Sequence, residues 1–139
     1  MLSNLALGKA GELRVASELL LRGHDVFLTI VDSGADLILG NGKRIQVKAA
    51  NRTKFKAEKK YLCSRYSFSF KSWKRTTNHY ESHKLESVDY IILWTVNDDA
   101  FFIIPANEVR GKYSVRLTLG PKDHSKYLAF RDNWDALKS

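Results

Sequence analysis

The sequence predicts an α/β fold in which an N-terminal helix precedes a mixed β-meander sheet flanked by helices. Three observations predict it. Apolar residues recur at three- and four-residue steps in 4–22, short β-branched and aromatic runs follow, and turn residues separate these runs. The 139 residues are enough for one domain with a buried core, and no repeat or linker divides them. We therefore expect a single domain over residues 1–139.

Each element follows from a local pattern. The helix is expected to end at Gly23, and its apolar stripe comprises Leu13, Ala16, Leu19 and Leu20. Strands are expected at 25–31, 35–39, 43–49, 61–70, 89–96, 100–105 and 113–119. Between and after them we expect a polar loop at 71–87 and a short helix at 130–138. Tyr66, Phe68 and Phe70 alternate as a core-facing set, whereas "IILW" and "FFII" fit either sheet core or an interface.

Net charge, cysteine and histidine content and the N-terminal pattern limit the classes of function that fit this chain. A net charge of +8 favours a polyanionic partner, most often nucleic acid and less often an anionic membrane surface. Cys63 is the only cysteine, and His24, His79, His83 and His124 are scattered, so neither a disulfide framework nor a zinc site is expected. The first 23 residues lack the pattern of a signal peptide or membrane span, which predicts a cytoplasmic protein with no membrane association.

The segment 34–48 predicts a hairpin with one polar face. If Gly40-Asn41-Gly42 is a three-residue loop with Gly42 left-handed, Asp36 lies opposite Gln46, and Lys48 shares their face. The other face then carries only apolar residues, Leu37, Leu39, Ile45 and Val47. A two-residue loop would mix the faces, which a buried sheet resists.

Glu12 is expected to add a carboxylate next to this polar face. It lies at the N-terminal end of the helix stripe that should dock on the sheet, where a carboxylate needs a cation partner. Gly8 and Gly11 flank it and are expected to allow close backbone approach. Glu12, Asp36 and Gln46 together provide the oxygen ligands of a hard-metal site, with Lys48 as an adjacent cation.

These residues resemble the motifs of the PD-(D/E)XK nuclease superfamily. The likeness lies in Glu12 of "GKAGEL", Asp36 of "GADLIL" and Gln46-Val47-Lys48 of "RIQVKAA". The chain is most similar to small single-domain members of the Gln-x-Lys type, including intron-encoded homing endonucleases, and is also similar to archaeal Holliday-junction resolvases. The resemblance implies a restriction-endonuclease-like core. Two positions depart from the pattern: Ala35 replaces a proline, and Gln46 replaces a carboxylate.

The resemblance also implies a mechanism. Glu12, Asp36, Gln46 and Lys48 would be catalytic, and Mg²⁺, for which Mn²⁺ could substitute, would be held by Asp36, Gln46, the Val47 carbonyl and Glu12, directly or through water. Lys48 would orient and help deprotonate the attacking water, or neutralise charge on the pentacovalent phosphate. The reaction would be site-specific double-strand cleavage of DNA by a homodimer or homotetramer without a nucleotide cofactor. The alternatives are a junction resolvase acting on branched DNA and a catalytically silent DNA-binding module, which the uncharged Gln46 would favour.

The basic segment 52–84 is the expected DNA-facing surface. Lysines and arginines there would contact phosphates, and aromatic or histidine side chains would contact bases or sugars. The predicted DNA-binding residues are Arg52, Lys54, Lys56, Lys71, Trp73, Lys74, Arg75, His79 and Tyr80.

Overall fold

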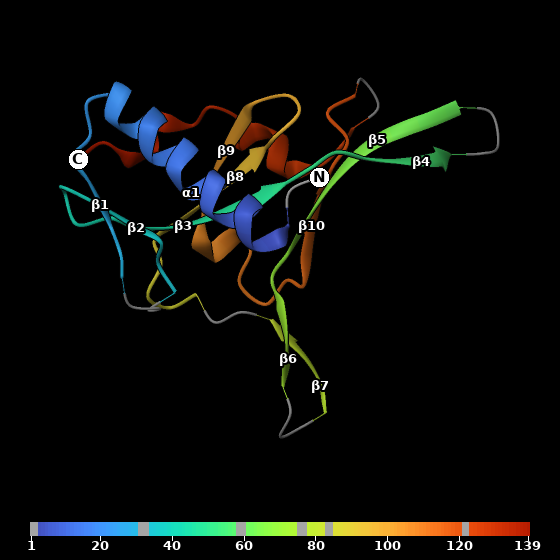
Figure 1. Cartoon of the computed structure of the whole chain (residues 1–139), viewed down its shortest axis with the longest axis horizontal. Helices are drawn as coiled ribbons and strands as arrows, with labels where there is room; N and C mark the ends of the chain where they lie inside the picture. The colour runs from blue at the N-terminus through green and yellow to red at the C-terminus, as the bar shows by residue number, and fades with distance from the viewer. Residues whose placement is uncertain (1–2, 31–33, 58–60, 75–77, 83–84, 121–122) are drawn as a thin grey trace.

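In the computed structural model, which describes residues 3–30, 34–57, 61–74, 78–82, 85–120 and 123–139, one α-helix lies against a five-stranded sheet (Figure 1). The strand order is β1-β2-β3-β8-β9, with β3 and β8 parallel and the other neighbours antiparallel. The predicted mixed α/β fold is therefore confirmed. The elements are α1 (Asn4–Leu21), β1 (Val26–Leu28), β2 (Leu37–Leu39), β3 (Arg44–Ala50), β8 (Tyr90–Thr95) and β9 (Ala100–Pro105).

Helix α1 occupies the predicted segment, but its buried stripe differs from the predicted one. Ser3 caps the helix, its hydroxyl accepting from the Ala6 N–H at 3.1 Å, and Gly23 follows the last turn with a φ of +92°. Leu13 and Leu20 were expected in the core, yet they are 52% and 58% exposed. The stripe that docks on the sheet is Leu7, Gly11, Val15, Ala16 and Leu19. Across the described residues, no helix is long and apolar enough to cross a bilayer.

The predicted hairpin register is present between β2 and β3. Leu37 pairs with Ile45 and Ile38 pairs with Arg44. The same register places Leu39 opposite Lys43, and the Leu39 N–H donates to the Lys43 carbonyl at 2.9 Å. Gly42 has a φ of +89°, as the three-residue loop requires. The predicted strand 25–31 is shorter, because β1 ends where Leu28 pairs with Leu37, the first residue of β2.

The sheet is covered on both faces, so its central strands are apolar throughout. On one face Ile92, Phe101 and Ile103 pack with α1 and with Trp134 and Leu137. On the other face a second cluster contains Ile91, Leu93, Phe102 and Ile104. The runs "IILW" and "FFII" are therefore sheet core rather than an exposed interface.

The second cluster is built on a three-stranded sheet with the order β10-β5-β4. Tyr66, Phe68 and Phe70 are buried in it, as their alternation predicted. Strand β4 was not anticipated, since its short sequence "TKFKA" contains two lysines and only two apolar residues, Phe55 and Ala57. The bounds are β4 (Thr53–Ala57), β5 (Tyr61–Ser69) and β10 (Ser114–Leu117).

Two further predictions concern segments outside the central sheet and are also wrong. The expected loop 71–87 contains a hairpin of β6 (Lys71–Lys74) and β7 (His79–Ser82), which sequence patterning missed because both strands are short and polar. The expected helix 130–138 is only a 3₁₀ turn, Trp134–Leu137. A bridge between Phe102 and Arg131 and a left-handed Asp132, whose N–H donates to the Phe101 carbonyl at 2.9 Å, tie this segment to β9 instead.

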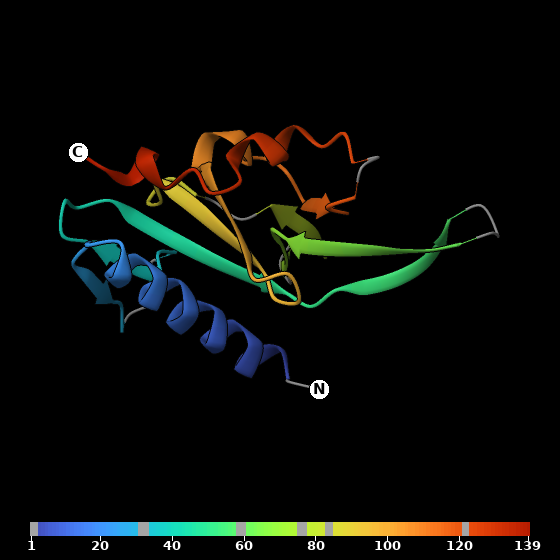
Figure 2. The ribbon, with the colours of Figure 1, turned by 90° about the horizontal axis from the view of Figure 1, so that it is seen from above.

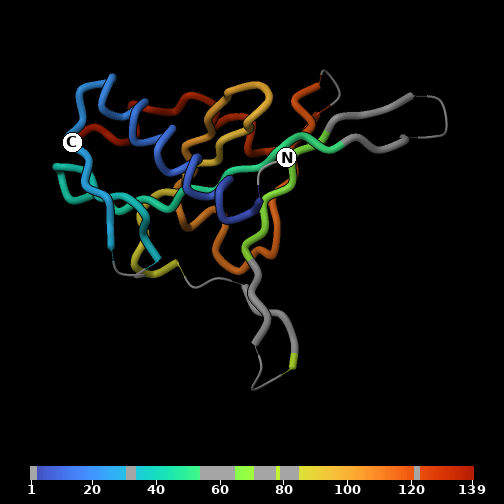
Figure 3. Tube along the Cα trace, viewed as in Figure 1, coloured from blue at the N-terminus to red at the C-terminus, as the bar shows by residue number. Residues whose placement is uncertain are grey.

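The C-terminal segment follows the sheet back to the end of α1, as the trace in Figure 3 and the side view in Figure 2 show. The other 3₁₀ turns are Ala106–Glu108 and Lys126–Phe130. The Asn41 amide donates to the Leu137 carbonyl at 2.8 Å, and the Arg22 guanidinium lies 4.4 Å from the Trp134 ring centroid. These contacts leave the N-terminal half of α1 facing β3 and β5, where a pocket forms.

Candidate functional site

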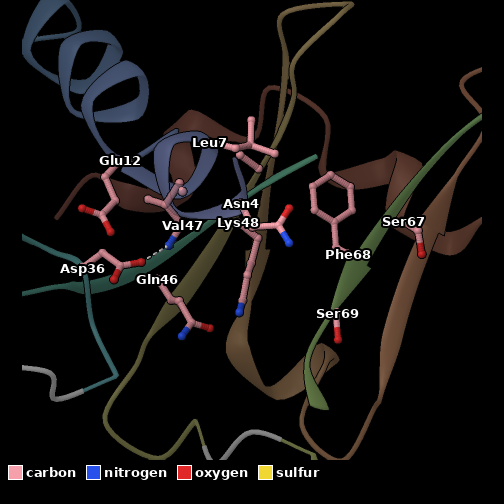
Figure 4. A pocket seen from close by; sticks show the side chains of 12 residues that line it. Asn4, Leu7, Glu12, Asp36, Gln46, Val47, Lys48, Ser67, Phe68 and Ser69 are labelled. Atoms are coloured by element: carbon pink, nitrogen blue, oxygen red, sulfur yellow. Dashed lines mark hydrogen bonds between the residues drawn. The ribbon is translucent and has the colours of Figure 1, made fainter. Parts of the chain in front are cut away.

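A pocket of about 410 Å³ opens between the N-terminal half of α1, β3 and β5 (Figure 4). It contains the predicted Glu12, Asp36, Gln46 and Lys48, which come from three separate segments of the chain. Figure 4 shows the carboxylates of Glu12 and Asp36 on one side of it and the Gln46 and Lys48 side chains next to them. Its lining is Asn4, Leu7, Gly8, Glu12, Asp36, Gln46, Val47, Lys48, Ala49, Ser67, Phe68 and Ser69.

Asp36 is fixed by the point at which β2 begins. Its N–H donates to the Ile45 carbonyl at 2.8 Å, although Ile45 is the register partner of Leu37, so the main chain departs from the β2–β3 register at Asp36. Strand β2 pairs with β3 only from Leu37 onward, and the Val47 N–H donates at 2.8 Å to Oδ2 of Asp36 (Figure 4). The carboxylate thus takes the place of a main-chain acceptor, which fixes its orientation at the pocket.

Gln46 presents an oxygen without a hydrogen-bond donor. The side-chain Oε1 is buried and has no hydrogen-bond partner. A buried acceptor in this state lowers stability by about 1–3 kcal/mol, so such atoms are rare in folded proteins and often mark a ligand position. The orphaned atom lines the same pocket as Asp36.

Glu12 reaches the pocket because α1 approaches β3 closely. An added Cβ on Gly11 would lie 2.8 Å from the Ala49 Cβ, so only glycine fits there, as predicted. The same prediction for Gly8 is wrong: nothing lies within 4 Å of a Cβ built there, and Gly8 lines the open pocket instead. The Glu12 side chain is 22% exposed and forms an ion pair with Lys9 at 2.8 Å.

Lys48 is held against an aromatic ring. Its Nζ lies 5.6 Å from the ring centroid of Phe70, which is fully buried. Burial lowers the pKa of the Lys48 ammonium below its ordinary value, and the nearby Asp36 carboxylate partly opposes that shift. The ammonium therefore lies in a partly desolvated position beside the carboxylates, where its charge acts more strongly than at the open surface.

Asn4, Ser67 and Ser69 line the pocket but were not anticipated. Ser67 and Ser69 alternate with the buried Tyr66 and Phe68 along β5, a pattern that predicts only a polar strand face. Their place beside Lys48 depends on the packing of β5 against β3. No local signal in the sequence encodes that contact between distant segments.

The donor set fits a hard divalent cation. Glu12 and Asp36 offer carboxylate oxygens and Gln46 offers its orphaned amide oxygen, the ligand types that Mg²⁺ and Mn²⁺ accept. Within the described residues, no group of three or more His, Cys, Asp or Glu side chains could hold a metal, so soft-ligand sites of the zinc type are not found there. Two carboxylates and one neutral oxygen provide less charge than three carboxylates would.

The predicted DNA-binding residues lie mainly on two hairpins outside the five-stranded sheet, β4–β5 and β6–β7. Arg52 is exposed, and its main-chain N–H donates to Oδ1 of Asn97 at 2.8 Å. The register between β6 and β7 pairs Trp73 with Tyr80 and Lys74 with His79, which brings four of the predicted residues together along the backbone. Arg75 lies outside the described residues. Of the others, Lys54 and Lys56 lie on β4 and Lys71 begins β6.

Comparison with known proteins identifies the family. The family model described as PD-(D/E)XK endonuclease matches residues 3–137, nearly the whole chain. The chain belongs to the PD-(D/E)XK endonuclease family. The resemblance inferred from Glu12, Asp36 and the Gln-x-Lys motif is thereby confirmed, and this PD-(D/E)XK protein is a nuclease.

A solved structure supports the fold of this PD-(D/E)XK endonuclease. The bacterial homing endonuclease I-Ssp6803I superimposes with a TM-score of 0.73, covering 94% of this chain and 90% of that one, at 16% sequence identity. At that identity the likeness concerns the fold alone. No curated protein sequence matches the chain significantly.

Proposed function

We propose that this chain is a Mg²⁺-dependent DNA endonuclease that hydrolyses phosphodiester bonds, with site-specific double-strand cleavage of the homing or restriction type. The observation that carries the proposal is the convergence of Glu12, Asp36, the orphaned Gln46 oxygen and Lys48 on one pocket. The basic segment that follows β3 supports DNA as the substrate. Residues 1–139 act as one nuclease domain in this proposal.

Each side chain has a role set by its position. Asp36, oriented by the Val47 N–H, and Gln46 would hold the cation, and Glu12 would complete its ligands directly or through water. When bound, a divalent cation supplies Lewis-acid chemistry that withdraws charge from the phosphate. Val47 follows Gln46 on β3 and lines the same pocket, and its main-chain carbonyl is the remaining protein ligand in this proposal.

Lys48 acts on the reacting groups from its position beside the carboxylates. Its ammonium, positioned by Phe70, would donate hydrogen bonds that orient the attacking water and offset the charge that develops on the phosphate oxygens. Asn4, Ser67 and Ser69 supply further polar atoms along the wall where the scissile strand would lie. The water attacks in line and gives up a proton as its oxygen bonds to phosphorus; the P–O bond to the leaving oxygen breaks, and that oxygen takes up a proton.

Cleavage of both strands requires two such sites, which a chain of this size gains most simply by two-fold assembly. A homodimer or homotetramer therefore forms part of the proposal.

A silent DNA-binding module is the second candidate function, favoured by the small number of carboxylates in the pocket.

The test compares the wild type with Asp36→Asn on plasmid pools and four-way junctions, in Mg²⁺ and in EDTA. Asn retains an oxygen that can accept from the Val47 N–H, so the variant should fold, and Asp135→Asn at an 89% exposed side chain is the matched control. Metal-dependent cutting should be lost only in Asp36→Asn. Discrete duplex products support the homing or restriction type, whereas junction-only cutting points to a resolvase. Salt-sensitive binding without cutting of either substrate would support the silent module.

A further inference from the structure

A second hollow lies between the C-terminal half of α1 and β1. It measures about 530 Å³, and its walls contain no charged side chain among the described residues. Several of its apolar side chains are unusually exposed: Leu13 52%, Leu20 58%, Leu21 79% and Leu28 55%. The lining is Leu13, Ala16, Ser17, Leu20, Leu21, Val26 and Leu28, which we call the α1–β1 face.

The charged residues of this half of α1 are directed elsewhere. Arg14 contacts Glu18 at 3.3 Å and Asp99 at 2.8 Å, and Arg22 contacts Glu18 at 3.1 Å. Both guanidinium groups also lie over aromatic rings, those of Phe101 on β9 and of Trp134 in the C-terminal segment. The flank of α1 toward β1 is consequently left without charge in a chain whose net charge is +8. Uncharged exposed surface of this kind marks an interaction site.

Strand β1 adds a backbone edge to this surface. It is the outermost strand in the order β1-β2-β3-β8-β9, and within the described residues it pairs only with β2. Its outer N–H and C=O groups can be matched by another strand. Val26 and Leu28 face the hollow, while Phe27 alternates to the other face of the strand and is 59% exposed.

We propose that the α1–β1 face binds a second copy of this chain, with the two β1 strands antiparallel about a two-fold axis at Phe27. An antiparallel pairing of "VFL" with itself is self-complementary, placing Phe27 opposite Phe27 and Val26 opposite Leu28. Two chains of +8 repel each other over their basic surfaces, so they associate best through a surface without charge. The same lack of cations excludes DNA as the occupant.

The proposed contact leaves the catalytic pocket accessible. The pocket uses α1 residues from Asn4 to Glu12, whereas the α1–β1 face begins at Leu13. The half-exposed apolar side chains would bury on the order of 400 Å² per copy. A standard interface buries about 800 Å² per partner, so apolar contact and strand pairing together are expected to give a weak, concentration-dependent dimer.

Sedimentation velocity across the micromolar range tests the face. The double variant Leu20→Lys, Leu28→Lys adds charge at two half-exposed positions, and Leu5→Lys is the control, because Leu5 is 87% exposed at the other end of α1. Wild type and Leu5→Lys should dimerise alike, whereas the double variant should dissociate at least tenfold more readily, with an unchanged circular dichroism spectrum. A wild type that is monomeric throughout, or equal association of all three proteins, would overturn the proposal.

Cross-linking tests the register. In a Cys63→Ser background, Phe27→Cys places the only thiol on the two-fold axis, where directly opposed Cβ atoms approach to roughly 4.5–5.5 Å. A disulfide dimer should form under mild oxidation, and Leu5→Cys should give little. Equal cross-linking of both variants, or none from Phe27→Cys, would refute the β1 pairing. Asp36→Asn should dimerise like wild type, so failure of this inference is distinct from failure of the proposed nuclease activity.

Discussion

Two glycines on one face of α1 offer a direct test of how closely the helix approaches the sheet. An added Cβ at Gly11 would lie 2.8 Å from the Ala49 Cβ, whereas one at Gly8 would have nothing within 4 Å. Carbon atoms prefer about 3.5–4.0 Å, so Gly11→Ala must move α1 away from β3 by roughly 1 Å. The partner atom is a Cβ on a strand, which has no flexible end that could turn aside.

The same replacement should therefore change stability in opposite directions. Gly8→Ala gains the helix preference of alanine over glycine, about 1 kcal/mol. Gly11→Ala gains a similar amount but incurs overpacking, which typically destabilises by about 1–3 kcal/mol. Urea unfolding followed by circular dichroism should place Gly11→Ala below Gly8→Ala by about 1–3 kcal/mol in unfolding free energy. Equal stabilisation of both variants would refute the close approach of α1 to β3.

Gly11→Ala should also impair the site, because Glu12 is the next residue and would move with the helix. A displacement of about 1 Å at a catalytic group can reduce the rate by roughly 10²-fold. Single-turnover cleavage, measured where both proteins are fully folded, separates this effect from loss of stability. A Gly11→Ala protein that cleaves at the wild-type rate would show that Glu12 need not be held at its present position.

Three further changes test separate parts of the molecule. Gln46→Met should raise the unfolding free energy by about 1 kcal/mol, because it removes a buried acceptor without a donor, and should weaken Mn²⁺ binding in calorimetric titration. Lys9→Met should tighten Mn²⁺ binding roughly two- to five-fold by releasing Glu12 from its ion pair, with Lys126→Met as the control of equal charge change at another exposed pair. Burial raises the pKa of Asp123, but the N–H groups of Ser125, Thr118 and Leu119 outweigh it and hold that pKa below its ordinary value. Asp123 thus stabilises the fold above about pH 4 and loses this effect as the pH falls through its lowered pKa, so the Tm difference between wild type and Asp123→Asn should vanish in acid.

The β2–β3 hairpin was predictable because the alternation of side chains in both of its strands has to agree with the length of the loop between them. Side chains alternate along a strand, and only a three-residue loop keeps Leu37 and Leu39 on the same face as Ile45 and Val47. That register predicted Asp36 opposite Gln46, and in the structure both residues line one pocket. The helix stripe was less constrained, since several residues of α1 are apolar enough to be core. Sequence patterning selected Leu13 and Leu20, which remain exposed beside β1.

The remaining differences arise where local sequence does not determine long-range packing. Strands β6 and β7 contain polar residues and form by pairing with each other, so their periodicity carries no apolar signal. Ser67 and Ser69 join the pocket only because β5 packs near Lys48. The segment 130–138 has a helical apolar spacing, but its contacts with Phe101 and Phe102 hold it as a 3₁₀ turn against β9.

The orientation of Asp36 depends on where secondary structure stops. Strand β2 pairs with β3 from Leu37, and the Val47 N–H, which a longer β2 would leave to a main-chain acceptor, donates instead to the Asp36 carboxylate. A slip of one residue in this register would replace that contact and turn Gln46 and Lys48 to the apolar face. The same ladder that stabilises the hairpin therefore positions the carboxylate, the orphaned amide oxygen and the ammonium. Variants that loosen the Gly40–Gly42 turn should accordingly reduce metal affinity even though they touch none of the ligands.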